Sequence, residues 1–168
     1  MYQVGEHVVY RNDGICRVEA VGKTSFSKQS GMDYYTLRPL YAKDKSRYYV
    51  PVNADRFIRN AVTREETYQC LTELEKLEPR PFCSKRPAEL TEHYDKLLIS
   101  NDMTAHLTLF KELCQKEKQA KESGKKFGQL DASYKNRVEK LLSDEFACAL
   151  GETPELSKER LYQAVISI

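Results

Sequence analysis

The sequence predicts an α+β protein with two domains: a small five-stranded β-barrel over residues 1–60 and an all-α domain of about five helices over residues 61–168. The first observation behind this prediction is the alternation of apolar and polar residues in the first sixty positions, which is typical of half-buried strands. The second is the change, after Thr63, to apolar residues spaced three or four positions apart, as on the buried face of a helix. A chain of 168 residues is long enough for two such domains.

The first two strands are predicted to form a hairpin. Val8 and Tyr10 begin an alternating pattern that Ile15 and Val18 continue after a turn containing Asp13-Gly14. Glycine adopts a positive φ without steric cost, so Asp-Gly between two alternating runs is a strong signal for a hairpin turn.

Two further strands are predicted at residues 33–38 and 47–52, each preceded by a polar loop. Pro51 has no backbone N–H to donate, so we expect it at the end of a strand or on an edge strand. Short strands at this spacing, rich in tyrosine and valine, are typical of an SH3-like or Tudor-like barrel.

The helical part opens with a capping box, in which the Thr63 and Glu66 side chains cover unpaired amides at a helix start. Asn101-Asp102 is expected to cap the third helix, Gly151 to stop the fourth, and Thr153-Pro154 to start the fifth. Three prolines between residues 79 and 87 mark a connector after the first helix. We expect helices near residues 64–78, 88–100, 102–123, 131–150 and 154–166.

Composition argues for a cytoplasmic protein without cofactor or metal. No apolar run approaches the roughly 20 residues that span a membrane, and the N-terminus lacks a basic segment followed by an apolar one. The cysteines are odd in number, widely scattered, and never spaced as Cys-x-x-Cys, which predicts free thiols and no zinc site. They are Cys16, Cys70, Cys83, Cys114 and Cys148.

Charge is segregated along the chain, although the net charge is only +2. Residues 1–60 carry 10 Lys/Arg and 6 Asp/Glu, a net of +4, whereas residues 61–168 carry 17 and 19, a net of −2. This segregation is compatible with two different contact surfaces.

The sequence argues against an enzyme. His7, His93 and His106 lack metal-ligand spacing, and we expect the last two on helix surfaces. No glycine-rich phosphate loop, nucleophile elbow or paired-carboxylate arrangement stands out. A compact β-module joined to helices suits an adaptor between two large partners better than a catalyst.

The pattern of the first sixty residues resembles the CarD-like regulators (the CarD/CdnL family), whose N-terminal module also occurs in the bacterial transcription-repair coupling factor. The residues that carry the resemblance are Val4-Gly5, Val8-Val9-Tyr10, Gly14, Val18, Tyr35-x-Leu37, Val50-Pro51-Val52 and Arg59. The helical part resembles the family more loosely, through residues 94–98, Asn101-Asp102 and residues 130–145.

The resemblance implies a Tudor-like domain that docks on the RNA polymerase β subunit through an exposed strand. It also implies a helical domain that approaches promoter DNA and favours the open complex, without chemistry of its own. Edge-strand pairing supplies main-chain hydrogen bonds, and alternate side chains supply specificity. The candidate polymerase-binding residues are Thr24, Phe26, Arg47, Tyr48, Tyr49 and Val50. Strand alternation requires one of the two tyrosines to face the barrel interior.

For the DNA contact, one departure from the family matters. Its polymerase-binding members commonly carry a tryptophan that wedges at the edge of the melted DNA, and this chain has no tryptophan. Phe82 is the candidate replacement; alternatively it pins the connector against the helices. We expect sequence-independent contacts to the DNA backbone from Lys85, Arg86, Lys125, Lys126, Lys135 and Arg137.

Two other functions fit the same residues. One is a peptide-binding Tudor-like module whose tyrosines form an aromatic cage for a methylated side chain. The other keeps the polymerase contact but has the helical domain bind a protein rather than DNA, as its net negative charge and the missing tryptophan suggest.

Overall fold

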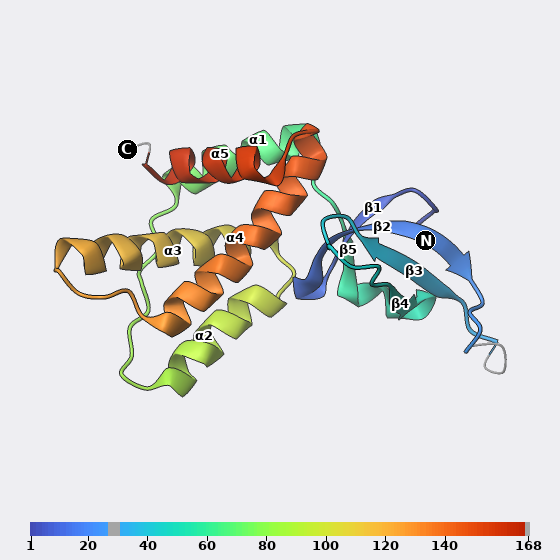
Figure 1. Ribbon diagram of the computed structural model, residues 1–168, viewed down its shortest axis with the longest axis horizontal. Helices are drawn as coiled ribbons and strands as arrows, with labels where there is room; N and C mark the ends of the chain where they lie inside the picture. Colours follow the sequence, from blue (N-terminus) through green and yellow to red (C-terminus); the bar gives the residue numbers. More distant parts are fainter. Residues whose placement is uncertain (27–30, 167–168) are drawn as a thin grey trace. The chain divides into compact units, whose positions relative to one another are not determined.

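The computed structural model describes residues 1–26 and 31–166 (Figure 1). The chain divides into two compact units, Met1–Ala61 and Val62–Ile168, which we call the N-terminal unit and the helical unit. Within the described residues, no helix is long and apolar enough to cross a membrane.

The N-terminal unit is a five-stranded antiparallel sheet in the order β4-β3-β2-β1-β5. Together with the helices that follow, this sheet confirms the predicted fold class of a barrel and a helical domain. Two short 3-10 helices, η1 (Arg11–Asp13) and η2 (Val52–Phe57), connect strands. The strands are β1 (His7–Tyr10), β2 (Gly14–Gly22), β3 (Tyr34–Pro39), β4 (Tyr48–Pro51) and β5 (Ile58–Asn60).

The predicted hairpin forms between β1 and β2, with Val9 opposite Ile15 and Tyr10 opposite Gly14. Gly14 has φ 97°, a value that L side chains rarely adopt, which explains glycine after the turn. One face of the sheet supplies the core of the unit, because alternate residues along a strand point to the same side. The fully or nearly buried members are Val8, Cys16, Val18, Tyr35, Leu37, Val50 and Ile58.

The helical unit contains α1 (Arg64–Lys76), α2 (Pro87–Ile99), α3 (Met103–Glu122), α4 (Gln129–Leu150) and α5 (Pro154–Ile166). The capping box of Thr63 and Glu66 forms, and the Asp102 side chain accepts the N–H of Ala105. Gly151 ends α4 in the left-handed conformation, with φ 66°. Local sequence signals therefore set these helix ends.

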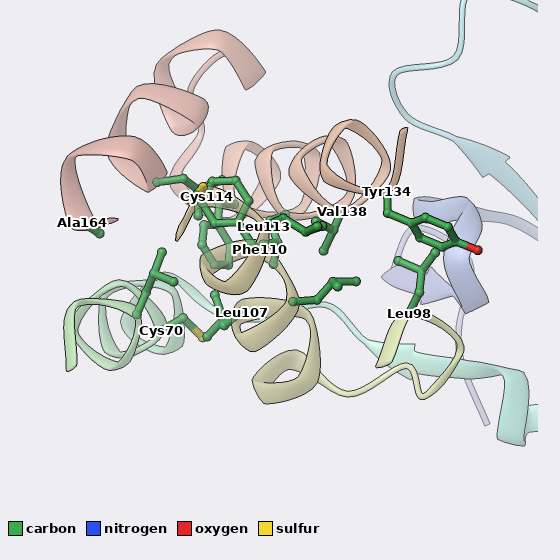
Figure 2. Close-up of a cluster of buried hydrophobic side chains, with 14 of the residues drawn as sticks. Cys70, Leu98, Leu107, Phe110, Leu113, Cys114, Tyr134, Val138 and Ala164 are labelled. Carbon is green, nitrogen blue, oxygen red and sulfur yellow. The ribbon is translucent and has the colours of Figure 1, made fainter. Parts of the chain in front are cut away.

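One apolar core draws side chains from all five helices, as Figure 2 shows with Cys70 of α1, Leu98 of α2, Phe110 of α3, Val138 of α4 and Ala164 of α5. The long central helices α3 and α4 contribute the most to this cluster, and both are amphipathic at helical spacing. The leucines and aromatic residues that the sequence places at helical spacing therefore form the packed interior of the unit.

Candidate interaction surfaces

Strand β4 forms one edge of the sheet, since in the described residues it pairs only with β3. The N–H of Val52 donates to the Asp33 carbonyl at 3.0 Å, and Val50 lies opposite Tyr35 in the same register. Because antiparallel pairs alternate, the main-chain groups of Val50 point toward β3 and those of Tyr49 point away from the sheet. The outer rim of β4 therefore offers backbone groups to a further strand.

An exposed aromatic cluster, made of Phe26, Tyr34 and Tyr49, borders this edge. The Phe26 ring meets each tyrosine ring edge to face, with both centroid distances at 5.2 Å. Phe26 is 59% exposed and Tyr49 is 47% exposed, which is unusual for large aromatic side chains. The Phe26 ring touches both tyrosine rings directly, so it leaves no gap between itself and either tyrosine for a methylated cation.

The other predicted docking residues are less accessible. Val50 is 2% exposed and faces the core, while Tyr48 packs against Tyr10 with ring centroids 5.3 Å apart. The Arg47 guanidinium donates to Glu19 at 2.5 Å and to the carbonyls of residues 45 and 46. Thr24 is half-buried. Of the six residues, Phe26 and Tyr49 present the most side chain to a partner.

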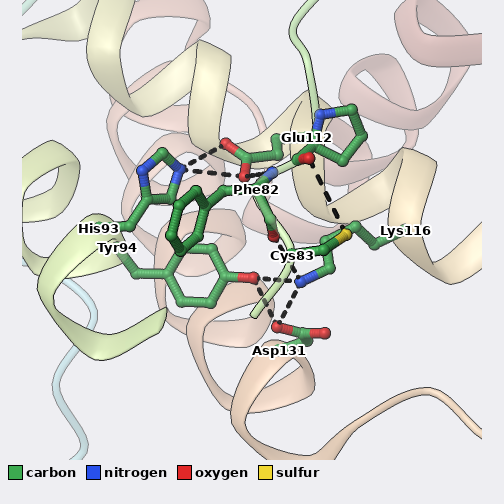
Figure 3. A network of polar contacts seen from close by, with 8 residues as sticks. Phe82, Cys83, His93, Tyr94, Glu112, Lys116 and Asp131 are labelled. Atoms are coloured by element: carbon green, nitrogen blue, oxygen red, sulfur yellow. Dashed lines mark hydrogen bonds and ion pairs between the residues drawn. The ribbon is translucent and has the colours of Figure 1, made fainter. Parts of the chain in front are cut away.

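In the helical unit, the connector is fixed at Phe82 (Figure 3). The Phe82 ring stacks on His93 with centroids 4.6 Å apart, and the Phe82 N–H donates to Glu112 at 2.8 Å. Lys116 donates to the Phe82 carbonyl at 3.0 Å. His93 Nε2 also donates to the Glu112 carboxylate, at 3.0 Å. Phe82 thus holds the connector against the helices, which is the alternative role that the sequence allowed.

The same network ties three helices together. Lys116 of α3 also donates to the Tyr94 hydroxyl of α2 at 2.7 Å and to Asp131 of α4 at 3.1 Å. The Tyr94 hydroxyl donates to Asp131 at 2.5 Å. Burial, together with the hydrogen bond to Asp131, raises the pKa of Tyr94 well above its ordinary value. Tyr94 therefore remains a neutral donor at any physiological pH.

Two more side chains of α3 cap the ends of other helices. Lys111 donates to the carbonyls of Leu74 and Glu75 at the end of α1, at 2.6 and 2.8 Å. His106 is 2% exposed and donates through Nε2 to the Leu98 carbonyl of α2 at 2.9 Å. The expectation that His106 lies on a helix surface is therefore wrong, because the last carbonyls of α2 need a buried donor.

Most of the predicted DNA-binding cations are exposed. Lys85 and Arg86 directly precede α2, Lys125 and Lys126 lie between α3 and α4, and Arg137 lies on α4. Arg86 also pairs with Glu89 at 3.5 Å, and the Arg137 guanidinium lies 5.0 Å from the ring of Tyr134.

Lys135, in contrast, is 8% exposed and donates to Glu117 at 2.6 Å. Burial alone would lower the pKa of Lys135, but the hydrogen bonds to Glu117 and Tyr162 outweigh it and raise the pKa. Its charge is paired with Glu117 inside the unit, so Lys135 is not part of an exposed cationic surface.

Residues 2–62 match the model of one protein family, the CarD-like/TRCF RID domain. This range covers the N-terminal unit, which is therefore a CarD-like RNA polymerase interaction domain, and it gives the protein a role connected with transcription. The match does not extend over the helical unit. Among curated proteins, none matches the chain.

Proposed function

We propose that this protein is a non-enzymatic transcription regulator that docks on the RNA polymerase β subunit through the edge of β4. Its helical unit then contacts the backbone of promoter DNA and stabilises the open complex. The observation that carries the docking proposal is the free edge of β4 beside the aromatic cluster, within a polymerase interaction domain.

A strand of the β subunit that adds to β4 would pair with the outward N–H and carbonyl of Tyr49. Pro51, the next residue whose main chain points outward, has no N–H, so it limits the ladder and restricts its register. Burial of the exposed Phe26 and Tyr49 rings would add apolar contact area, and aromatic anchors of this kind dominate many interfaces.

For DNA, the supporting observation is the set of exposed cations at the start of α2 and in the α3–α4 connection. The Lys116–Tyr94–Asp131 network joins α2, α3 and α4, the helices that the segments carrying these cations precede or connect. Such contacts go to phosphates and carry no base sequence information. In this proposal Phe82 positions the connector and does not enter the DNA.

The docking proposal is tested with the full-length chain and an immobilised fragment of the β subunit. Tyr49→Ala removes the exposed ring, and we expect it to weaken binding by about tenfold, as for an aromatic interface anchor. Tyr49→Pro also removes the outward N–H, so it should bind more weakly still. Tyr68→Ala, a change at a tyrosine of α1 that is 43% exposed, is the matched control. Normal binding by Tyr49→Pro would show that β4 is not the docking edge.

The DNA proposal is tested by the salt dependence of binding to a polymerase–promoter complex. Replacing Lys125 and Lys126 with glutamine should lower the log–log salt slope by close to two units, about 0.9 for each lost phosphate contact. The same double substitution at Lys140 and Lys158, exposed lysines that pair with Asp144 and Glu139, should leave the slope unchanged. If the slope is insensitive to Lys125 and Lys126, a protein partner for the helical unit becomes the better explanation.

A further inference from the structure

Two arginines of the N-terminal unit lie against one aromatic ring. The guanidinium carbon of Arg11 is 3.6 Å from the centroid of the Phe57 ring, and that of Arg56 is 4.7 Å from it. Together these distances place the two positive charges no more than about 8 Å apart. Both side chains are exposed, and Arg11 also lies 5.7 Å from the ring of Tyr10.

This arrangement brings two like charges together. Among the side chains that the structure describes, no carboxylate forms an ion pair with Arg11 or Arg56. Arg11 also has φ 46°, in the left-handed region that residues other than glycine seldom occupy. Unfavourable backbone of this kind concentrates at functional sites, where the surrounding structure holds it in place.

The chemistry of the pair points to an anionic ligand of high charge density. A guanidinium over a ring face is held by the cation–π interaction, while its N–H groups remain at the edge, free to donate. That edge matches the oxygens of a phosphate group, to which arginine binds through two parallel hydrogen bonds. Since Phe57 holds both groups in place, little side-chain freedom remains to be lost on binding.

We propose that Arg11 and Arg56, stacked on Phe57, form a clamp for the phosphodiester backbone of nucleic acid on the N-terminal unit. A nucleic-acid backbone is favoured over an acidic protein segment because it presents a regular, dense row of negative charges to two adjacent cations. The unit around the clamp is itself basic, with 10 Lys/Arg against 6 Asp/Glu in residues 1–60.

The clamp adjoins β1 and β5, and Arg11 also lies 5.7 Å from the Tyr10 ring, which packs against Tyr48 of β4. Arg11 follows β1 and Phe57 precedes β5, and these are the last two strands in the order β4-β3-β2-β1-β5. A partner strand that adds to β4 would pair with the outward main chain of Tyr49, which is not part of the clamp. The N-terminal unit could then hold both a protein and nucleic acid.

The test uses the full-length chain and a short DNA duplex of mixed sequence, with fluorescence anisotropy measured over a series of salt concentrations. We expect the double substitution Arg11→Gln and Arg56→Gln to weaken binding by roughly tenfold at low salt. It should also lower the log–log salt slope by close to two units, about 0.9 for each phosphate contact. Phe57→Leu, which keeps both charges, should weaken binding by a smaller factor because the guanidiniums lose their support.

The matched control is the double substitution Arg17→Gln and Arg38→Gln. These two exposed arginines lie opposite each other on β2 and β3, and their replacement changes the net charge of the unit equally. The control should retain most of the affinity. An equal loss in both double variants would reduce the effect to net charge and overturn the clamp, as would unchanged binding by the Arg11 and Arg56 variant.

Binding to the β-subunit fragment separates this inference from the proposed function. The clamp variants should bind that fragment normally, since neither arginine belongs to β4 or to the aromatic cluster. If the clamp variants lose binding to the β-subunit fragment but retain binding to DNA, the site contacts an acidic protein surface and the inference is wrong. If only the Lys125 and Lys126 variant loses binding to DNA, the DNA contact lies on the helical unit and the clamp proposal is wrong.

Discussion

The two units pair their buried main-chain groups in different ways. In the N-terminal unit the strands pair with one another, and the core facing the sheet is apolar. In the helical unit every helix leaves unpaired carbonyls and amides at its ends, and side chains from other helices cover several of these carbonyls. Accordingly, all the buried polar or charged side chains identified in the described residues belong to the helical unit: Thr67, His106, Lys111, Glu112, Lys135, Ser143, Glu145 and Ser157.

This difference has a consequence for how each unit tolerates substitution. A sheet core depends on apolar volume, whereas the helical core also depends on single polar side chains that cannot be replaced by apolar ones of similar size. We therefore expect the following substitutions to lower the unfolding free energy by decreasing amounts. Each one tests whether a unit depends on apolar volume or on single polar or charged side chains.

The largest loss is expected from Glu112→Ala. Glu112 is 1% exposed and accepts hydrogen bonds from His93 and from the Phe82 N–H, so its removal leaves both donors without their acceptor. Breaking a buried charged network in this way should cost about 4 kcal/mol, measured by denaturant unfolding. Glu122→Ala, at an exposed position of the same helix, is the control. A loss below that of a typical surface change would mean that Glu112 is dispensable to the fold.

Leu37→Ala tests the apolar side of the comparison. Leu37 is fully buried in the N-terminal unit, and its truncation should cost that unit about 3 kcal/mol. Amide hydrogen exchange should show faster opening of β1–β4, while α3 and α4, which belong to a separate core, keep their protection. Equal loss of protection in both units would indicate that they unfold together. Val4→Ala, at a residue that is 62% exposed, should change neither the unfolding free energy nor the exchange protection of the N-terminal unit.

Lys111→Met keeps the volume of the buried side chain but removes its donors. The carbonyls of Leu74 and Glu75 would lose their partner, at a cost of about 2 kcal/mol. Burial lowers the pKa of Lys111, yet the two carbonyls still need its N–H groups. Lys118→Met, at an exposed position of α3, provides the reference. If the two variants unfold at the same denaturant concentration, the cap on α1 contributes nothing.

The smallest effect is expected from Glu19→Gln in the N-terminal unit. Glu19 pairs with Arg47 at 2.5 Å and with Arg38 at 3.8 Å, but these groups lie at the surface, where water screens them. Loss of the charge should cost less than about 1 kcal/mol in thermal or denaturant unfolding. A cost as large as that of Lys111→Met would contradict the comparison, because the sheet unit would then also depend on ionic contacts.

Much of the local structure could be read from the sequence. The hairpin at Gly14, the capping box at Thr63 and the stop at Gly151 form as predicted, because each signal acts on backbone within a few residues. Apolar residues spaced three or four positions apart likewise identified the buried faces of α3 and α4. The resemblance to a polymerase interaction domain rested on the first sixty residues, where the family match also lies.

Long-range partners depended on the tertiary structure. Nothing near His106 in the sequence indicates that it meets the Leu98 carbonyl. Lys135 lies in a basic segment, and that charge predicted an exposed position. Likewise, Arg11 and Phe57 are far apart in sequence and meet only because β1 pairs with β5. The sequence by itself determined the division into sheet and helices and the ends of several elements, because those depend on local backbone preferences and on apolar period. Which charges are exposed, which are buried, and which strand is left at the edge were decided by packing between segments distant in sequence.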